Sequence, residues 1–154
     1  MSILRSKTYL SDLRYTVENT SILSRLRDMS VLITGGTGLI GSSIVDLLLM
    51  ANLVKKLNIK VFVAARNIAK AENRFSDFPD QDVLNYLEYI NYDATKYNSF
   101  PLCTNYIIHA ASNAHPRVFV ENPVDTMLSN IDGLKELLIY AKNTVNIAVA
   151  PSRT

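Results

Sequence analysis

Four glycines near residue 40 have the spacing of a phosphate-binding turn. The segment 30–41 reads SVLITGGTGLIG, an apolar strand-like run followed by Gly35, Gly36, Gly38 and Gly41. Glycine permits positive φ and has no Cβ to obstruct a phosphate. Gly36, Gly38 and Gly41 fit the pattern G-x-G-x-x-G, and Gly35, Gly38 and Gly41 fit the variant G-x-x-G-x-x-G. An apolar helical pattern begins at Leu39, inside the motif. A helix N-terminus there would offer N–H groups and a partial positive charge to a pyrophosphate.

This glycine-rich segment has two alternative interpretations. It is not a Walker A loop, because no Gly-Lys-Ser/Thr follows. It either binds the phosphates of a dinucleotide or is a purely structural loop before a helix. Its position after a predicted strand, before a helix and within a unit that returns to a second strand at 60–65 favours dinucleotide binding.

The position that usually selects between NAD and NADP carries no carboxylate. About 20 residues past the glycines, an acidic side chain normally holds the ribose hydroxyls of NAD. Here the sequence is Ala64-Ala65-Arg66-Asn67. An arginine can pair with a 2′-phosphate or stack on adenine, so Arg66 favours NADP over NAD. Alternatively, Arg66 is a solvated charge at the end of a strand and has no role in cofactor binding.

Two more polar groups follow predicted strands. Asp93 could accept a hydrogen bond from the adenine amino group, or could simply form a turn. His109 could exchange a proton near a ribose, but a lone histidine at a strand end is more often structural. The sequence supplies no His/Cys/Asp/Glu cluster with metal-ligand spacing, and we assign neither a metal site nor a catalytic residue.

Strands alternating with helices predict an α/β protein with a doubly wound parallel sheet, the Rossmann architecture. We expect about five strands in the order 3-2-1-4-5, with ligands bound at the carboxyl ends between the first and fourth strands. Residues 1–29 form an N-terminal extension of one or two short helices, with Ser11 as a cap, or a partly ordered arm. Residues 30–150 form the cofactor-binding domain and 151–154 a tail. The predicted strands are 31–33, 58–65, 87–92, 106–110 and 145–149, and the predicted helices are 39–54, 68–75 and 123–141.

The last predicted helix begins with a good start signal and carries one apolar stripe. Asn122 can cap it and Pro123 suits its first position. The stripe comprises Val124, Met127, Leu128, Ile131, Leu134, Leu138 and Ala141.

Bulk properties exclude several classes of protein. The chain has 154 residues, 48% hydrophobic and 19% charged, which suits one globular domain. A net charge of +2 gives no argument for nucleic acid or acidic membranes as partners. The longest apolar run, 44–53, is too short to span a bilayer, and no signal peptide is evident. With a single cysteine, the expected compartment is the cytoplasm.

Together these residues resemble the extended short-chain dehydrogenase/reductase family, the NAD-dependent epimerase/dehydratases that act on nucleotide sugars. The matching segments are TGGTGLIG at 34–41, Asp93, HAA at 109–111, and an N-P…N-x-x-G-x-x-x-L-L pattern from Asn122 to Leu138. The resemblance implies that the glycines hold the pyrophosphate of NAD or NADP, that Asp93 contacts adenine, that the alanine pair lines the nicotinamide, and that Asn130 shapes the active-site helix. The expected cofactor-binding residues are Gly35, Thr37, Gly38, Leu39, Ile40, Gly41, Arg66, Asn67, Asp93, Ala94, Ala110, Ala111, Ser112 and Asn130.

The chain departs from this family in its catalytic residues. The family uses a Ser/Thr and a Tyr-x-x-x-Lys that follow the fifth strand, where this chain has only Pro151 to Thr154. Tyr92 and Lys96 spell Y-x-x-x-K but lie between the third and fourth strands, on the adenine side, and Ser152 has no partner. We therefore expect a truncated cofactor-binding half of a nucleotide-sugar epimerase, dehydratase or decarboxylase, inactive alone. A stand-alone NAD(P)-binding or interaction module, or a non-functional remnant, is the alternative. Self-association is expected because the edge at 146–149 and the last helix would lack cover.

Overall fold

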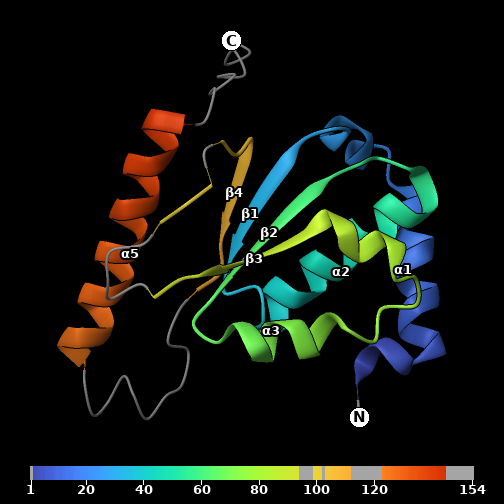
Figure 1. Ribbon diagram of the computed structural model, residues 1–154, viewed down its shortest axis with the longest axis horizontal. Coiled ribbons are helices and arrows are strands. Elements are labelled where there is room, and N and C mark those ends of the chain that lie inside the picture. The colour runs from blue at the N-terminus through green and yellow to red at the C-terminus, as the bar shows by residue number, and fades with distance from the viewer. Residues whose placement is uncertain (1, 94–98, 102, 112–122, 145–154) are drawn as a thin grey trace.

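A computed structural model describes residues 2–93, 99–101, 103–111 and 123–144, without the side chains of 125, 126, 128–130 and 144 (Figure 1). Within these ranges, no helix combines the length and apolar character needed to cross a lipid bilayer. The elements in chain order are η1 (Ile3–Arg5), α1 (Lys7–Asn19), η2 (Ile22–Leu26), β1 (Ser30–Thr34), α2 (Leu39–Lys55), β2 (Lys60–Ala65), α3 (Ile68–Phe75), η3 (Asp82–Tyr86), β3 (Leu87–Asn91), β4 (Tyr106–His109) and α5 (Pro123–Thr144).

The four strands form one parallel sheet in the order β3-β2-β1-β4. This confirms the predicted Rossmann-type α/β architecture and the predicted order of the first four strands. The fifth predicted strand, 145–149, lies outside the described residues. The order reverses between β1 and β4, so the switch point of the sheet lies between these two strands.

Helices cover both faces of the sheet. α1, α2 and α3 lie on one side and α5 on the other (Figure 1). Parallel strands covered on both faces need apolar residues at nearly every position, which explains the continuous apolar runs of β1 and β2. In β2, every residue after Lys60 is buried.

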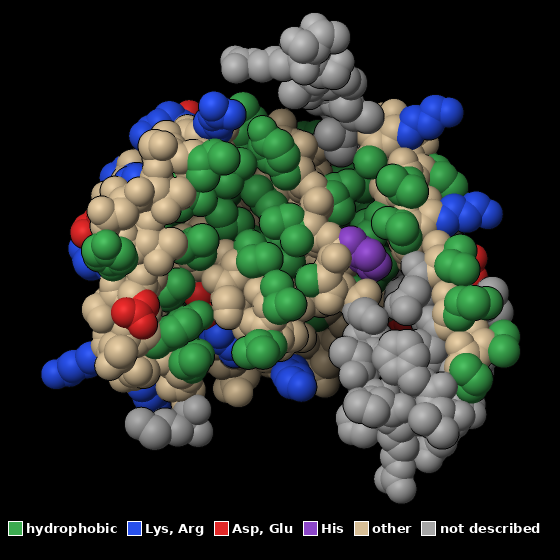
Figure 2. All heavy atoms as spheres, turned by 180° about the vertical axis from the view of Figure 1, so that it is seen from behind, with side chains coloured by type: hydrophobic (Ala, Val, Ile, Leu, Met, Phe, Trp, Pro, Cys, Tyr) green, Lys and Arg blue, Asp and Glu red, His purple; other side chains and the backbone are tan. Residues whose placement is uncertain are grey.

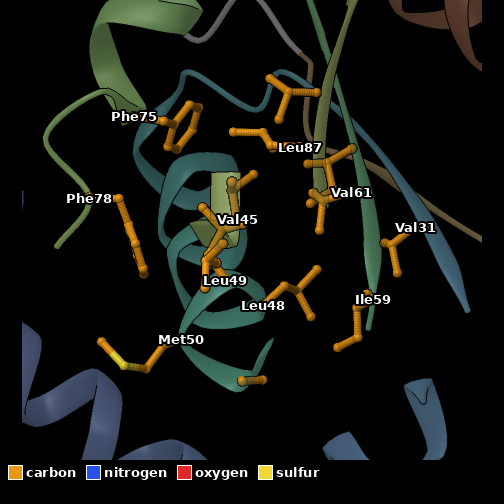
Figure 3. Packing of buried hydrophobic residues seen from close by; sticks show 14 of the residues in the cluster. Val31, Val45, Leu48, Leu49, Met50, Ile59, Val61, Phe75, Phe78 and Leu87 are labelled. Atoms are coloured by element: carbon orange, nitrogen blue, oxygen red, sulfur yellow. The ribbon is translucent and has the colours of Figure 1, made fainter. Parts of the chain in front are cut away.

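The larger core lies between the sheet and α2. Alternate residues of β1 and β2, such as Val31 and Val61, point to this face and meet Val45, Leu48 and Leu49 of α2 (Figure 3). Phe75 at the end of α3 and Phe78 after it close the core on the side away from β1 (Figure 3). Burying each such side chain contributes about 1.5–3 kcal/mol, so this core supplies much of the stability of the domain.

The smaller core lies between the sheet and α5, and the exposed members of the apolar stripe lie outside it. Leu137 of α5 is buried and packs near Leu32 and Phe62. Tyr140 of the same helix lies 4.8 Å from Phe100, ring centroid to centroid. The stripe does not face the sheet, because Val124, Met127, Ile131, Leu134 and Leu138 are all exposed. A helix turns 100° per residue, so Leu137 and Leu138 cannot share one face.

The N-terminal segment packs on α2 as part of the larger core. Leu4, Leu13, Val17 and Leu23 are buried in the same cluster as the strands. The cap of α1 is Ser6, whose hydroxyl accepts a hydrogen bond from the Tyr9 N–H, and not Ser11 as predicted. Ser11 is exposed and donates to the carbonyl of Thr8.

A buried ion pair fixes α1, α2 and α3 to one another. Asp46 of α2 is fully buried and lies 2.6 Å from the Arg74 guanidinium of α3, Oδ2 to Nη2. The Tyr9 hydroxyl of α1 donates to the same carboxylate at 2.7 Å. Burial raises the pKa of Asp46, whereas the hydrogen bonds from Arg74 and Tyr9 act to lower it.

Candidate functional site

The carboxyl ends of all four strands meet at one edge of the sheet. The register pairs Thr34 of β1 with Ala64 of β2 and with His109 of β4. Ala65 of β2 pairs with Asn91 of β3. The glycine turn, Arg66, Asp93 and the residues after His109 therefore emerge at the same edge, as the sequence predicted.

Three glycines of the turn are needed by the packing of the chain itself. Gly35 has φ +68°, and a Cβ there would lie 2.6 Å from the carbonyl oxygen of Ala110. A Cβ on Gly36 would lie 2.9 Å from a methyl group of Val63. A Cβ on Gly41 would overlap the carbonyl oxygen of Gly35. These close approaches let β1, β4 and α2 converge at the turn.

Gly38 differs from the other three glycines because it is exposed and a side chain there would have fewer close contacts. A Cβ there would lie 3.2 Å from the carbonyl oxygen of Gly35, and, apart from its chain neighbours and the backbone of α2 itself, no other described atom would lie within 4 Å. Gly38 is the N-cap residue of α2 and, having no side chain, makes no capping hydrogen bond. The first N–H groups of a helix have no intrahelical partner, so those of Leu39, Ile40 and Gly41 are available to an anion.

The first turn of α2 is open to solvent. Leu39 is 87% exposed and Ile40 is 70% exposed, which is unusual for large apolar side chains. Thr37 is half-buried. A pyrophosphate fits this cradle chemically: it needs N–H donors and a surface without side chains, and both are present.

The two candidates after β2 behave differently. Arg66 is exposed and makes no ion pair with any residue that the structure describes. Asn67 is the N-cap of α3, and its Oδ1 accepts a hydrogen bond from the Lys70 N–H at 2.8 Å. Arg66 is therefore available to a ligand, while the Asn67 side chain already holds the start of a helix.

Tyr92, which the sequence analysis rejected as a catalytic residue, lies in an environment that opposes its ionisation. It is 2% exposed, and its hydroxyl has no hydrogen-bond partner among the described residues. Burial raises the pKa of Tyr92, and the negative charges of Glu136 and Asp93 raise it further. A tyrosine that acts as a base needs the opposite shift.

The remaining candidates are only partly described. Asp93 is half-buried and follows β3 by two residues, and Ala110 and Ala111 are half-buried beside Gly35. Ala94, Ser112 and the side chain of Asn130 lie outside the described part of the structure, as do Lys96 and Ser152.

Sequence reasoning missed one side-chain contact at this edge. The Thr34 hydroxyl and the His109 ring nitrogen Nδ1 lie 2.7 Å apart. Each is the last residue of its strand, so a correct register between β1 and β4 would have placed them side by side. Strand-end positions were available from the sequence, but the register was not.

Comparisons with known proteins agree with this geometry. The model of the NAD dependent epimerase/dehydratase family matches residues 31–150. Among solved structures, one described as the X-ray structure of Pen from Bacillus thuringiensis matches at 27% sequence identity with a TM-score of 0.60. The match covers 75% of this chain and 34% of that chain, so this chain corresponds to about a third of that structure. A search of curated proteins found no match.

Proposed function

The chain belongs to the NAD dependent epimerase/dehydratase family, and we propose that it binds a nicotinamide dinucleotide at the glycine turn. The observation that carries this proposal is the uncapped N-terminus of α2 beside a glycine turn at the switch point between β1 and β4. Ligands in such sheets bind outside the carboxyl ends of the strands at that point.

Each part of the dinucleotide has a proposed position. The pyrophosphate lies against the first-turn amides of α2, between Gly35 and Gly41. The adenosine half extends toward the ends of β2 and β3, where Arg66 and Asp93 lie. The nicotinamide half extends toward Ala110 and Ala111 after β4. When bound, the nicotinamide supplies hydride transfer.

Calorimetric titration with NAD tests the proposal. We expect binding by the unmodified chain and at least about 10-fold weaker binding by Gly38→Val, because the added side chain displaces a phosphate from charge-assisted hydrogen bonds. Gly38 is exposed, so this variant should remain folded. Ser11→Val in α1, also exposed, is the control and should bind normally. Equal binding by Gly38→Val and the unmodified chain would refute the proposed position of the pyrophosphate.

We further propose that NADP binds at least as well as NAD. The 64–67 segment has no carboxylate to hold the ribose hydroxyls, and Arg66 is exposed without an ion-pair partner among the described residues. Arg66→Ala is expected to weaken NADP binding by about 3- to 10-fold and to leave NAD binding unchanged, since only NADP carries the 2′-phosphate. Lys70→Ala, another exposed cation nearby in the chain, is the control. A clear preference of the unmodified chain for NAD would contradict this assignment.

The substrate class and the activity are also proposals. We propose a nucleotide sugar as the substrate of longer relatives, a cytoplasmic location, and no turnover by these 154 residues alone. The chain contains one Tyr-x-x-x-Lys, at Tyr92 and Lys96, and the environment of Tyr92 opposes ionisation. A missing general base costs about 10²–10⁴-fold in rate. An NAD(P)H absorbance assay on a panel of nucleotide sugars should show no turnover, and measurable turnover would contradict this proposal. A binding module without turnover, or a non-functional remnant, would give the same negative assay.

We also propose that the chain self-associates through α5. Its exposed stripe, visible along one edge of Figure 2, has alternating spacings of three and four residues, as in helices that pair with one another. The exposed members of the stripe are Val124, Met127, Ile131, Leu134 and Leu138.

Light scattering tests this association. We expect a dimer or larger species for the unmodified chain and a shift toward monomer for Leu138→Glu, because a charge would be buried in the helix pair. Ile139→Glu is the matched control: Ile139 is the next residue and similarly exposed, at 53% against 61%, but lies 100° around the helix. A monodisperse unmodified monomer would contradict the association, and equal effects of both substitutions would contradict the role of the stripe.

A further inference from the structure

A side-chain hydrogen bond joins β1 and β4 at the switch point. Thr34 Oγ1 and His109 Nδ1 lie 2.7 Å apart, and the two residues are paired in the strand register. Thr34 is fully buried and His109 is half-buried. Thr34 directly precedes the glycine turn, and His109 directly precedes Ala110, so the bond joins the two segments expected to contact the two halves of the dinucleotide.

Two other contacts act at the same place. The Ala110 N–H donates to the carbonyl of Thr34 at 3.0 Å. Gly35 lies so close to Ala110 that a Cβ on Gly35 would come within 2.7 Å of the backbone of both Ala110 and Ala111. The start of the glycine turn and the chain after β4 are therefore held together by a backbone hydrogen bond, by direct packing and by the side chain of His109.

The protonation state of His109 suits this bond. Burial lowers the pKa of His109, so the imidazole is neutral at neutral pH. A neutral imidazole has one donor and one acceptor nitrogen, and a threonine hydroxyl can donate or accept. The pair is therefore satisfied with either tautomer, and no other protein group is needed to complete it.

We propose that His109 is a positioning residue for the bound dinucleotide, acting through Thr34. It keeps the chain after β4 at a fixed spacing from the glycine turn, so that one ligand can meet both at once. This inference rests on the proposed function, because it concerns the same site. Loss of the bond should weaken a ligand that spans both segments more than a ligand that contacts the turn alone.

Comparison of NAD with ADP makes that difference measurable. ADP carries the adenosine and the diphosphate but lacks the nicotinamide half. Its binding should therefore not depend on the spacing between the glycine turn and the chain after β4. Calorimetry is performed with both ligands on the full chain. For Thr34→Val and His109→Leu, which keep size but remove the hydrogen bond, we expect about 3- to 10-fold weaker NAD binding, the value of one hydrogen bond, and unchanged ADP binding.

Conservative variants provide the rescue. Thr34→Ser keeps the hydroxyl, and His109→Asn places an amide where Nδ1 lies, so both should restore NAD binding to near the unmodified value. His109→Gln extends its amide toward the position of the other ring nitrogen and should not restore it. The unmodified chain should show an Nδ1 signal typical of a hydrogen-bonded nitrogen in ¹⁵N spectra of the imidazole, and Thr34→Val should shift it.

The outcomes separate the inference from the proposed function. If the unmodified chain binds NAD and all variants bind it equally well, the positioning role is wrong while the dinucleotide site stands. Equal weakening of NAD and ADP binding would also overturn the positioning role, because it would indicate a general loss of structure. If the unmodified chain binds neither ligand, the proposed function fails and this inference fails with it.

Discussion

Gly41→Ala is expected to lower the free energy of unfolding by about 2 kcal/mol and to abolish measurable dinucleotide binding. The new Cβ would overlap the carbonyl oxygen of Gly35 and lie 2.9 Å from both the carbonyl carbon of Gly35 and the Cα of Gly36. Forcing an extra methyl group against packed atoms costs about 1–3 kcal/mol, and these atoms are backbone, which cannot rotate away. The better helix propensity of alanine offsets at most about 1 kcal/mol.

Thermal unfolding of Gly41→Ala beside Gly38→Ala checks this expectation. The two substitutions are identical and three residues apart, but the close contact that the described residues give a Cβ on Gly38 is a single one, to the Gly35 carbonyl oxygen at 3.2 Å. We expect Gly41→Ala to melt several degrees lower, since about 1 kcal/mol shifts Tm by roughly 2–4 °C in a chain of this size. Gly38→Ala should melt close to the unmodified chain. Equal melting temperatures for both variants would contradict the close packing of α2 on the turn.

Arg74→Met is expected to lower the free energy of unfolding by about 3 kcal/mol at pH 7. It leaves the fully buried carboxylate of Asp46 without its cation, and breaking a buried pair from one side typically costs about 3–5 kcal/mol. Because the Tyr9 hydroxyl still donates a hydrogen bond to Asp46, we expect a loss at the lower end of this range. Arg5→Met is the control, because the Arg5–Asp77 pair is exposed and such pairs contribute little to stability.

The effect of Arg74→Met should depend on pH in a defined direction. The pKa of Asp46 in the folded protein is raised, so the folded state favours its protonated form more than the unfolded state does. Removing Arg74 removes an influence that lowers this pKa, and so raises it further. Protonation of Asp46 therefore stabilises the folded protein. This stabilisation is fully present below the pKa that Asp46 has in the unfolded chain, and it is lost as pH rises through the pKa that Asp46 has in the folded protein. The deficit of Arg74→Met relative to the unmodified chain should therefore shrink as pH falls from 7 toward 4.

Denaturant titrations of both proteins at several pH values measure this deficit. The double variant Asp46→Leu/Arg74→Met should recover most of the lost stability, because an apolar pair leaves no buried charge. A deficit for Arg74→Met that grows on acidification, or one no larger than that of Arg5→Met, would contradict the role of the buried pair.

The sequence predicted the parts of the fold that depend on local patterns. The helix at 68–75 matches α3 residue for residue, and Leu39 begins α2 as expected. The order of four strands followed from alternation of strands and helices together with right-handed crossovers. The gathering of the glycine turn, Arg66 and Asp93 at one edge followed from parallel strands alone.

What the sequence did not predict depends on contacts between distant residues. The Asp46–Arg74 pair joins residues 28 apart in the chain, and the Thr34–His109 pair joins residues 75 apart. Neither leaves a periodic pattern. The stripe on α5 was visible in the sequence, but periodicity shows only that apolar residues share a face, and not that this face meets the sheet. Ser11 had the right residue type for a cap, but the helix begins five residues earlier, after Ser6.

The central claim, that a dinucleotide lies on the glycine turn, is tested most directly by NMR. Backbone amide shifts of the full chain are followed as NAD is added. The largest changes should fall on Gly35 to Gly41, with smaller changes at Arg66 and Ala110. A pocket lies away from the glycine turn, lined by residues at the end of α2 and around η3, among them Asn52, Lys56, Asp82 and Tyr86. Shifts confined to that pocket, or no shifts at the turn at saturating NAD, would contradict the claim.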